Sequence, residues 1–321
     1  MIAGFSADDL RALELFYPHA YKRTMDALQQ QIRFVHYSSA ESAMKMLSNG
    51  EVWMRKASAM NDFREIDYGK ECLISAYKSE AGQQFKATLN EMFPGFTDTL
   101  EERFNGWLPH FESSTYLTCI SEHDPTEDLI GRLSMWRAYG GATGVAVVLR
   151  GAPFLIPTDA LKAYTSPVAY LTVDQFQVEF EQMAKGIANN AEFIKGRGEG
   201  NVLGSVFDAF RYATVCTKHP GFREEREWRV AYNPKWEQSS RIVQAVETIR
   251  GVPQIVQKIP LVDIPDEGLV GISVPDLVER VIIGPTDFPW EIREATIEML
   301  TARGVADADK KVIVSDIPLR H

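Results

Sequence analysis

The stretch Arg223-Glu224-Glu225-Arg226-Glu227-Trp228-Arg229 decides the fold prediction for this chain. Together with the apolar residues that follow it, it predicts a strand over residues 225–232. A strand that carries this much charge lies in a sheet with one polar and one apolar side, as is common in antiparallel and mixed sheets. This stretch therefore favours a sheet that is not buried on both faces.

The two faces of this strand differ in character. In an extended chain, Glu225, Glu227 and Arg229 point to one side, while Trp228 and Val230 point to the other. The tryptophan and the valine supply the side that packs on a core. The side with two acids and a base is either a solvated surface or the lining of a cleft.

Working outward, apolar periodicity and turn residues predict the remaining elements. Helices are expected over residues 6–31 (with Pro18 as a possible break), 38–49, 67–107, 129–139, 174–215 and 290–302. Strands are expected over residues 32–37, 52–54, 115–120, 145–149, 168–171, 241–246, 255–260, 279–283 and 312–315. Because strands and helices do not alternate regularly, the sequence predicts a single α+β domain with a mixed or antiparallel central sheet and helical insertions at 67–107 and 174–215.

Composition narrows the class of protein. The 321 residues carry a formal net charge of −10, so no overall basic field attracts nucleic acid or an anionic membrane. The three cysteines, Cys72, Cys119 and Cys216, are far apart and fit reduced thiols better than a disulfide framework or a zinc site. The N-terminal stretch has acids where a signal peptide needs bases, and no run of residues is apolar enough to span a membrane. We expect a soluble, cytoplasmic protein with no membrane partner and no bound metal.

A second polar cluster lies where the first predicted strand meets a helix. His36 and Ser38 share a strand face there, with Tyr37 between them, and Ser38 or Ser39 can cap the helix. A helix N-terminus offers free N–H groups to a phosphate-bearing ligand. Both a nucleotide site and a purely structural role for these residues stay open.

Other polar and aromatic residues are candidates for the lining of the same site. Asn61 and Asp62 form a turn pair followed by Glu65, and Lys218 precedes the charged strand. Trp136 and Tyr139 are three residues apart on a predicted helix, where they either belong to the core or stack on a planar ligand.

Taken together, these motifs resemble the DUF2971 family of uncharacterised bacterial proteins, whose members are suspected of defence or toxin roles. The resemblance extends from about residue 34 to residue 320 and rests on the order and spacing of short motifs. They are HYSS at 36–39, LSNG at 47–50, MND at 60–62 with Glu65, TCIS at 118–121, MWRAYG at 135–140, GVAVVL at 144–149, Lys218 with FREEREWRV at 222–230, VERVIIGP at 278–285 and VIVSDIPLR at 312–320. One departure is that Asn61-Asp62-Phe63-Arg64-Glu65 lacks the proline that the family usually has after the aspartate.

The first strand and helix are also similar to those of DarT-like and other ADP-ribosyltransferases. That resemblance implies that His36 and Ser38 contact the nicotinamide ribose or amide of NAD. It also implies that Glu227, or Glu225, stabilises the oxocarbenium charge that develops as the C–N bond breaks. Tyr37 or Trp136 would stack on the nicotinamide, and the acceptor of ADP-ribose would be a nucleic acid or a protein.

Three functions follow as hypotheses. The first is an NAD-consuming ADP-ribosyltransferase or glycohydrolase. The second is a non-catalytic sensor or interaction module whose polar cleft, with Arg229 in its wall, recognises a nucleotide or a phage component. The third is a metal-dependent nuclease that uses Asp62, Glu65, Glu225 and Glu227 as oxygen ligands and Lys218 beside the phosphate.

Overall fold

A computed structural model describes residues 6–60, 65–249 and 251–319 of the chain. The chain forms two compact units. Unit 1 consists of residues 1–26, 56–115 and 166–223, and unit 2 consists of residues 27–55, 116–165 and 224–321. Four elements contain residues of both units: α2 (Pro18–Gln30), β2 (Glu51–Lys56), β5 (Tyr164–Pro167) and the 3-10 helix η5 (Pro220–Glu225).

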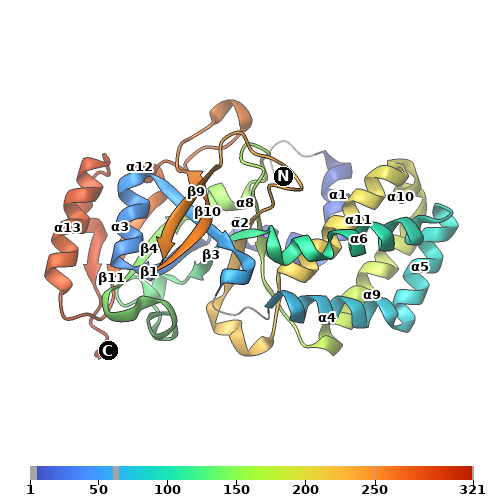
Figure 1. The fold of residues 1–321 in the computed structure, drawn as a ribbon, viewed down its shortest axis with the longest axis horizontal. Coiled ribbons are helices and arrows are strands. Elements are labelled where there is room, and N and C mark those ends of the chain that lie inside the picture. Colours follow the sequence, from blue (N-terminus) through green and yellow to red (C-terminus); the bar gives the residue numbers. More distant parts are fainter. Residues whose placement is uncertain (1–5, 61–64, 250, 320–321) are drawn as a thin grey trace. The chain divides into compact units, whose positions relative to one another are not determined.

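Unit 2 is built on a mixed sheet whose strands run in the order β12-β11-β4-β1-β3-β2-β10-β9, with β8 paired to β3 (Figure 1). The other strands are β1 (Arg33–Ser39), β3 (Tyr116–His123), β4 (Gly144–Arg150), β8 (Glu227–Tyr232), β9 (Val243–Ile249), β10 (Val252–Pro260), β11 (Val278–Ile283) and β12 (Val312–Val314). The pairs are antiparallel except for β11 with β12, among those whose register is described. The predicted α+β class with a mixed, mostly antiparallel sheet is confirmed.

The centre of the sheet is the strand pair β1 and β4. Every residue of β4 from Gly144 to Leu149 is buried, because its continuous apolar run packs against side chains on both faces. β1 pairs with β4 along its whole length, from Arg33 opposite Arg150 to Ser39 opposite Gly144, without a bulge. This unbroken register fixes which side chains of β1 point to which face.

One face of the sheet packs on helices α3 and α13, which lie side by side (Figure 1). Ser39 caps α3 by accepting a hydrogen bond from the Ser42 N–H at 3.3 Å, and Gly50 ends the helix in the left-handed conformation with φ 65°. The helices of unit 2 are α3 (Ala40–Asn49), α7 (Leu133–Met135), α8 (Ala152–Leu155), α12 (Val274–Leu277), α13 (Pro289–Ala302) and α14 (Ala308–Lys311). We call this side the Trp228 face, because Trp228 and Phe34 meet on it with ring centroids 5.3 Å apart.

The opposite side, which we call the Trp136 face, carries a second and smaller core. Val35 and Tyr37 of β1 pack there with Ala146, Val148 and Trp136. The predicted helix over residues 129–139 is shorter than expected: α7 passes into a single wide turn over Trp136–Gly140, and residues 129–132 are not helical. The packing of the large indole into this core takes the place of a regular helix.

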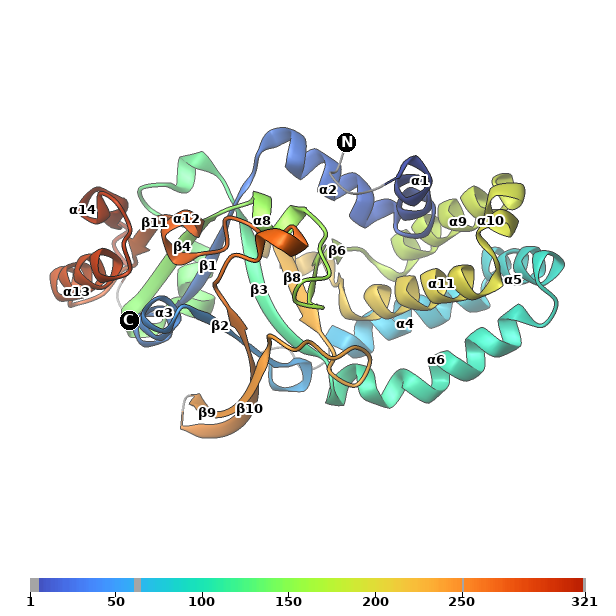
Figure 2. The ribbon, with the colours of Figure 1, turned by 90° about the horizontal axis from the view of Figure 1, so that it is seen from above.

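Unit 1 is mainly helical, and its helices are shown from above in Figure 2. They are α1 (Ala7–Phe16), α4 (Glu65–Lys78), α5 (Glu80–Met92), α6 (Phe96–Ser113), α9 (Val173–Asn189), α10 (Ala191–Arg197) and α11 (Glu199–Val215), together with the short strands β6 (Ala169–Tyr170) and β7 (Thr217–Lys218). Both predicted helical insertions lie in this unit. The breaks fall where the sequence places them: α1 ends at Phe16 before Pro18, and Gly198 separates α10 from α11 with φ 82°.

Among the residues that the structure describes, no helix is both long enough and apolar enough to cross a bilayer.

The tight packing around Trp136 makes a testable prediction. A Cβ added to Gly284 would lie 2.8 Å from two ring carbons of Trp136, which is only 1% exposed and has no room to move. We expect Gly284→Ala to lower the free energy of unfolding by about 1–3 kcal/mol, the usual cost of overpacking a core. Urea unfolding followed by tryptophan fluorescence measures this difference.

Gly106 provides the matched control. It lies in the middle of α6, and a Cβ added there meets nothing within 4 Å. Gly106→Ala is expected to raise the free energy of unfolding by about 0.5–1 kcal/mol, since alanine loses less conformational freedom in a helix. Equal effects of the two substitutions would contradict the packing of Trp136 described here.

Candidate functional site

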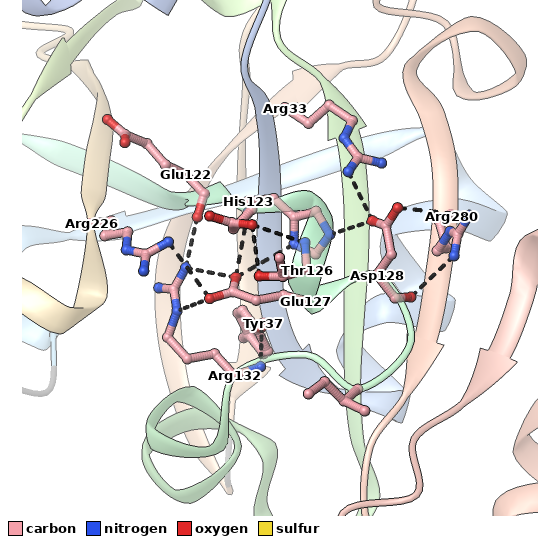
Figure 3. Close-up of polar contacts among 12 residues, drawn as sticks. Arg33, Tyr37, Glu122, His123, Thr126, Glu127, Asp128, Arg132, Arg226 and Arg280 are labelled. Carbon is pink, nitrogen blue, oxygen red and sulfur yellow. Dashed lines mark hydrogen bonds and ion pairs between the residues drawn. The ribbon is translucent and has the colours of Figure 1, made fainter. Parts of the chain in front are cut away.

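Arg132 follows the loop after β3, and its side chain forms five hydrogen bonds (Figure 3). Its guanidinium group binds both carboxylate oxygens of Glu127, with Nε to Oε1 and Nη2 to Oε2 both at 2.9 Å. The other donors reach the backbone carbonyls of Glu122 at 2.8 Å, Glu224 at 2.8 Å and Glu225 at 3.3 Å. All five guanidinium N–H groups thus have an acceptor.

These bonds join the C-terminal end of β3 to the N-terminal end of β8. The side chain of Arg132 is only 10% exposed, so its hydrogen bonds are shielded from competition with water. The backbone N–H of Arg132 also donates to the Tyr37 hydroxyl at 2.8 Å, which ties the same loop to β1. Burial raises the pKa of Tyr37 to about 12, so the hydroxyl stays protonated at neutral pH.

A second set of charges surrounds His123 at the end of β3 (Figure 3). Its Nε2 lies 2.8 Å from Asp128 Oδ1, so the neutral ring carries its proton on Nε2 and donates it to the carboxylate. Arg33 lies 2.9 Å from the same Asp128 oxygen, and Arg280 donates to the Asp128 carbonyl at 3.2 Å. Burial lowers the pKa of His123, and the bond to Asp128 opposes that shift.

Of the predicted site residues, four are brought together on the Trp136 face. Tyr139 donates a hydrogen bond to Glu225 Oε1 at 3.1 Å, and the Tyr37 and Trp136 rings meet edge to face with centroids 4.8 Å apart. The indole N–H of Trp136 donates to the Ile130 carbonyl at 2.9 Å. Since Trp136 is 1% exposed, it belongs to the core and is not available to stack on a ligand.

Glu227 and Arg229 form a buried pair at the start of β8. Arg229 Nε lies 3.0 Å from Glu227 Oε1, and Nη2 lies 3.3 Å from Oε2. The side chains are 7% and 2% exposed, respectively. Removing either partner deprives the other of charge-assisted hydrogen bonds in a buried site.

His36 and Glu227 project from opposite faces of the sheet. Phe34 contacts Trp228, so both lie on the Trp228 face, and His36 lies two residues along β1 from Phe34. Opposite His36 on β4 is Val147, which belongs to the same core as Trp228. Glu227 precedes Trp228 and therefore points to the Trp136 face. The two residues that the transferase hypothesis combines do not share a strand face.

On the Trp228 face, His36 lies beside Ser38. His36 Nδ1 lies 2.9 Å from the carbonyl of Cys119, which only accepts, so Nδ1 carries the proton and Nε2 is an acceptor. Burial lowers the pKa of His36, which favours this neutral form. Ser38 Oγ donates to the Ser39 carbonyl at 3.3 Å.

The remaining predicted site residues are Lys218, Asn61 and Asp62. Lys218 is a buried residue of unit 1, where its Nζ lies 4.7 Å from the centroid of the Phe222 ring. Asn61 and Asp62, like the side chain of Glu65, lie outside the described residues. The nuclease hypothesis depends on Asp62 and Glu65 and stays a prediction.

Sequence reasoning missed the residues that organise this region, namely Arg132, Glu127 and Asp128. They lie in a stretch that looks like an ordinary polar loop followed by a helix. The one available signal was Asp124-Pro125-Thr126-Glu127, a capping box that the structure confirms as a 3-10 turn over Pro125–Glu127. That signal predicts a turn and gives no indication of the arginine that binds it.

The sheet order, the helices on its Trp228 face and the charged junction of β3 with β8 define an α+β protein with a polar network at one end of its sheet. The family model described as protein of unknown function (DUF2971) matches residues 135–230. This segment runs from Met135 to Val230 and includes both the MWRAYG motif and the FREEREWRV motif. The match confirms the resemblance to the DUF2971 family over this segment.

Comparison with curated proteins found no match, and comparison with solved structures found none either. The similarity of the first strand and helix to DarT-like enzymes stays a prediction.

Because the Arg132 side chain forms five hydrogen bonds, we expect that a lysine at this position cannot form the same network. An ammonium group has three donors and no planar fork, so at least one buried carbonyl and one carboxylate oxygen lose their partner. We expect Arg132→Lys to lower the free energy of unfolding by about 2–3 kcal/mol. Arg137→Lys, at an exposed position five residues further on, is the control and is expected to change it by less than about 0.5 kcal/mol. Similar urea midpoints for both variants would show that the network contributes little.

Three histidines whose pKa values are lowered by burial predict a dependence of stability on pH. They are His19, His36 and His123, whereas in the unfolded chain the pKa of histidine is about 6.5. Below about pH 6.5 the unfolded chain therefore binds protons that the folded chain does not, and the free energy of unfolding falls with falling pH. Urea midpoints at about pH 7.5 and about pH 5.5 check this, and His36→Asn is expected to reduce the difference. An equal or higher urea midpoint at about pH 5.5 would contradict the lowered pKa values of these histidines.

Proposed function

We propose that unit 2 recognises a nucleotide at the C-terminal end of β1 and does not cleave it. The observation that carries this proposal is the placement of His36 and Glu227 on opposite faces of the sheet. A cleavage mechanism that uses both residues needs them to face one ligand. Recognition needs only His36 and its neighbours on the Trp228 face.

The polar groups of His36 and Ser38 on the Trp228 face are suited to bind a ribose. The neutral imidazole offers Nε2 as an acceptor for a ribose hydroxyl, and Ser38 lies on the same strand face. α3 begins directly after Ser39. Backbone N–H groups in the first turn of a helix that lack a helical acceptor can bind phosphate oxygens. The acid in that turn, Glu41, is paired with Lys45 at 2.7 Å, which offsets its charge.

The state of Glu227 also favours recognition without turnover. A glutamate that stabilises an oxocarbenium ion has to direct a carboxylate oxygen at the ribose. In this chain both oxygens of Glu227 lie within hydrogen-bonding distance of Arg229, and both side chains are buried. The pair is better suited to holding β8 in the sheet than to contacting a substrate.

Measurements with NAD distinguish a protein that only binds the nucleotide from an enzyme that consumes it. We expect titration calorimetry on the full chain to detect NAD binding, and His36→Ala to weaken it about tenfold, the effect of one lost hydrogen bond. Ser48→Ala, at an exposed position of the same helix, is the control and should leave the affinity unchanged. Glu227→Gln is expected to lower stability and keep the affinity.

Nicotinamide release is measured in parallel, with cell extract supplying a possible acceptor. No release by the wild-type chain is expected. Release that disappears in folded Glu227→Gln would overturn the proposal and establish the NAD-consuming enzyme. Absence of NAD binding, or binding that His36→Ala leaves unchanged, would remove the nucleotide site on the Trp228 face.

The NAD-consuming enzyme is the second candidate, and one observation favours it through Glu225. This carboxylate is half-buried and oriented by the hydroxyl of Tyr139, so it is more accessible than Glu227. Release of nicotinamide that is lost in Glu225→Gln and retained in Glu227→Gln would assign the reaction to this residue.

A further inference from the structure

Unit 1 contains a cavity of about 120 Å³, separate from every residue discussed in unit 2. The first turn of α2 forms one wall, and α9 and α11 form much of the remainder. The elements around it are rigid pieces of secondary structure rather than loop tips. A space of this kind, lined by helices that pack on one another, is a common form of small-molecule site.

The wall is mainly aromatic. Phe16, Phe176, Phe180 and Phe210 line the cavity, and each is less than a tenth exposed. The ring centroids of Phe180 and Phe210 lie 6.2 Å apart. The ring of Phe85 also packs on Phe180, with centroids 5.3 Å apart. Rings held in this way do not collapse into the space. For comparison, an apolar cavity of roughly 150 Å³ in another protein holds benzene, so a single six-membered ring is a suitable occupant.

Two lining residues, His19 and Tyr212, each have a buried polar atom without a hydrogen-bond partner among the described residues, Nε2 and Oη respectively. Nε2 of His19 is buried and forms no hydrogen bond with any described residue. Burial lowers the pKa of His19, the charge of Arg23 adds to the shift, and a hydrogen bond to the backbone of Val168 opposes it. Because a backbone acceptor engages the other ring nitrogen as donor, Nε2 is left as an unpaired acceptor.

The charge in the wall restricts the occupant further. Glu179 on α9 is a half-buried lining residue, and a carboxylate there repels an anionic ligand such as a fatty acid. Since most of the wall is apolar, a strongly hydrated cation is also a poor occupant. An uncharged ring with one donor fits both the aromatic wall and the free acceptor.

We propose that this cavity binds a small uncharged aromatic molecule of phenol size, which donates one hydrogen bond to Nε2 of His19. The ring occupies the space between the phenylalanines, and its hydroxyl or N–H group replaces the partner that the protein does not supply. This site is independent of the nucleotide site proposed for unit 2.

Phenol and toluene are the matched probes, since they have the same shape and differ in one donor. We expect both to bind the full chain in titration calorimetry. In His19→Leu, the ratio of phenol affinity to toluene affinity should fall about tenfold relative to the wild type, because only phenol loses a hydrogen bond. An unchanged ratio would overturn the role of His19.

Filling the cavity tests its location. Ala213→Leu on α11 adds three carbon atoms to the wall and should abolish binding of both probes, and Ala20→Leu on α2 is an alternative if the first variant does not fold. Gly106→Ala on α6, which adds a methyl group in open space, should bind them as the wild type does. Failure of the wild-type chain to bind either probe, or binding that survives both filled variants, would overturn the proposal.

Discussion

The guanidinium group of Arg132 is the interaction on which the rest of unit 2 depends. It joins the end of β3 and the loop that follows it to the residues that lead into β8, which lie 92 residues further along the chain. Without it, the carbonyls of Glu122 and Glu224 would lose a hydrogen-bond donor, and the carboxylate of Glu127 would lose both hydrogen bonds to the guanidinium. The group thus holds the entrance of β8 against the end of β3, beside the ladder that pairs the two strands.

The alternation of side chains along β1 and β8 then decides what the motif can do. Side chains that are neighbours along a strand point to opposite faces of the sheet. His36 therefore lies on the Trp228 face, and Tyr37 lies on the Trp136 face. The family motifs therefore do not form one catalytic centre on a single strand face. They place His36 and Ser38 at a strand end on one face and a network of tyrosines, arginines and glutamates on the other.

Unit 1 depends on a different kind of interaction. Its phenylalanines contact one another across α5, α9 and α11, with ring centroids 5.3–6.2 Å apart, and Phe180 and Phe210 also line the cavity. The rigidity of such aromatic contacts allows a space to remain open where aliphatic side chains would adjust to fill it. The helical insertions thus contribute most of the wall of the cavity.

The sequence by itself determined most of the local structure. The strands Glu227–Tyr232 and Gly144–Arg150 and the helix between Ser39 and Gly50 follow from periodicity and capping, which act over a few residues and are therefore visible in the chain. The predicted strand over residues 225–232 begins two residues late, because Glu225 ends a 3-10 turn. The sequence also determined that Trp228 anchors its strand. What only the tertiary structure decided was which groups meet, because the acceptors of Arg132 lie up to 93 residues away and no local pattern encodes that distance. The same holds for the separation of His36 from Glu227: alternation is a property of each strand, but the register between strands, which sets the shared face, is fixed by the packing of Phe34 on Trp228.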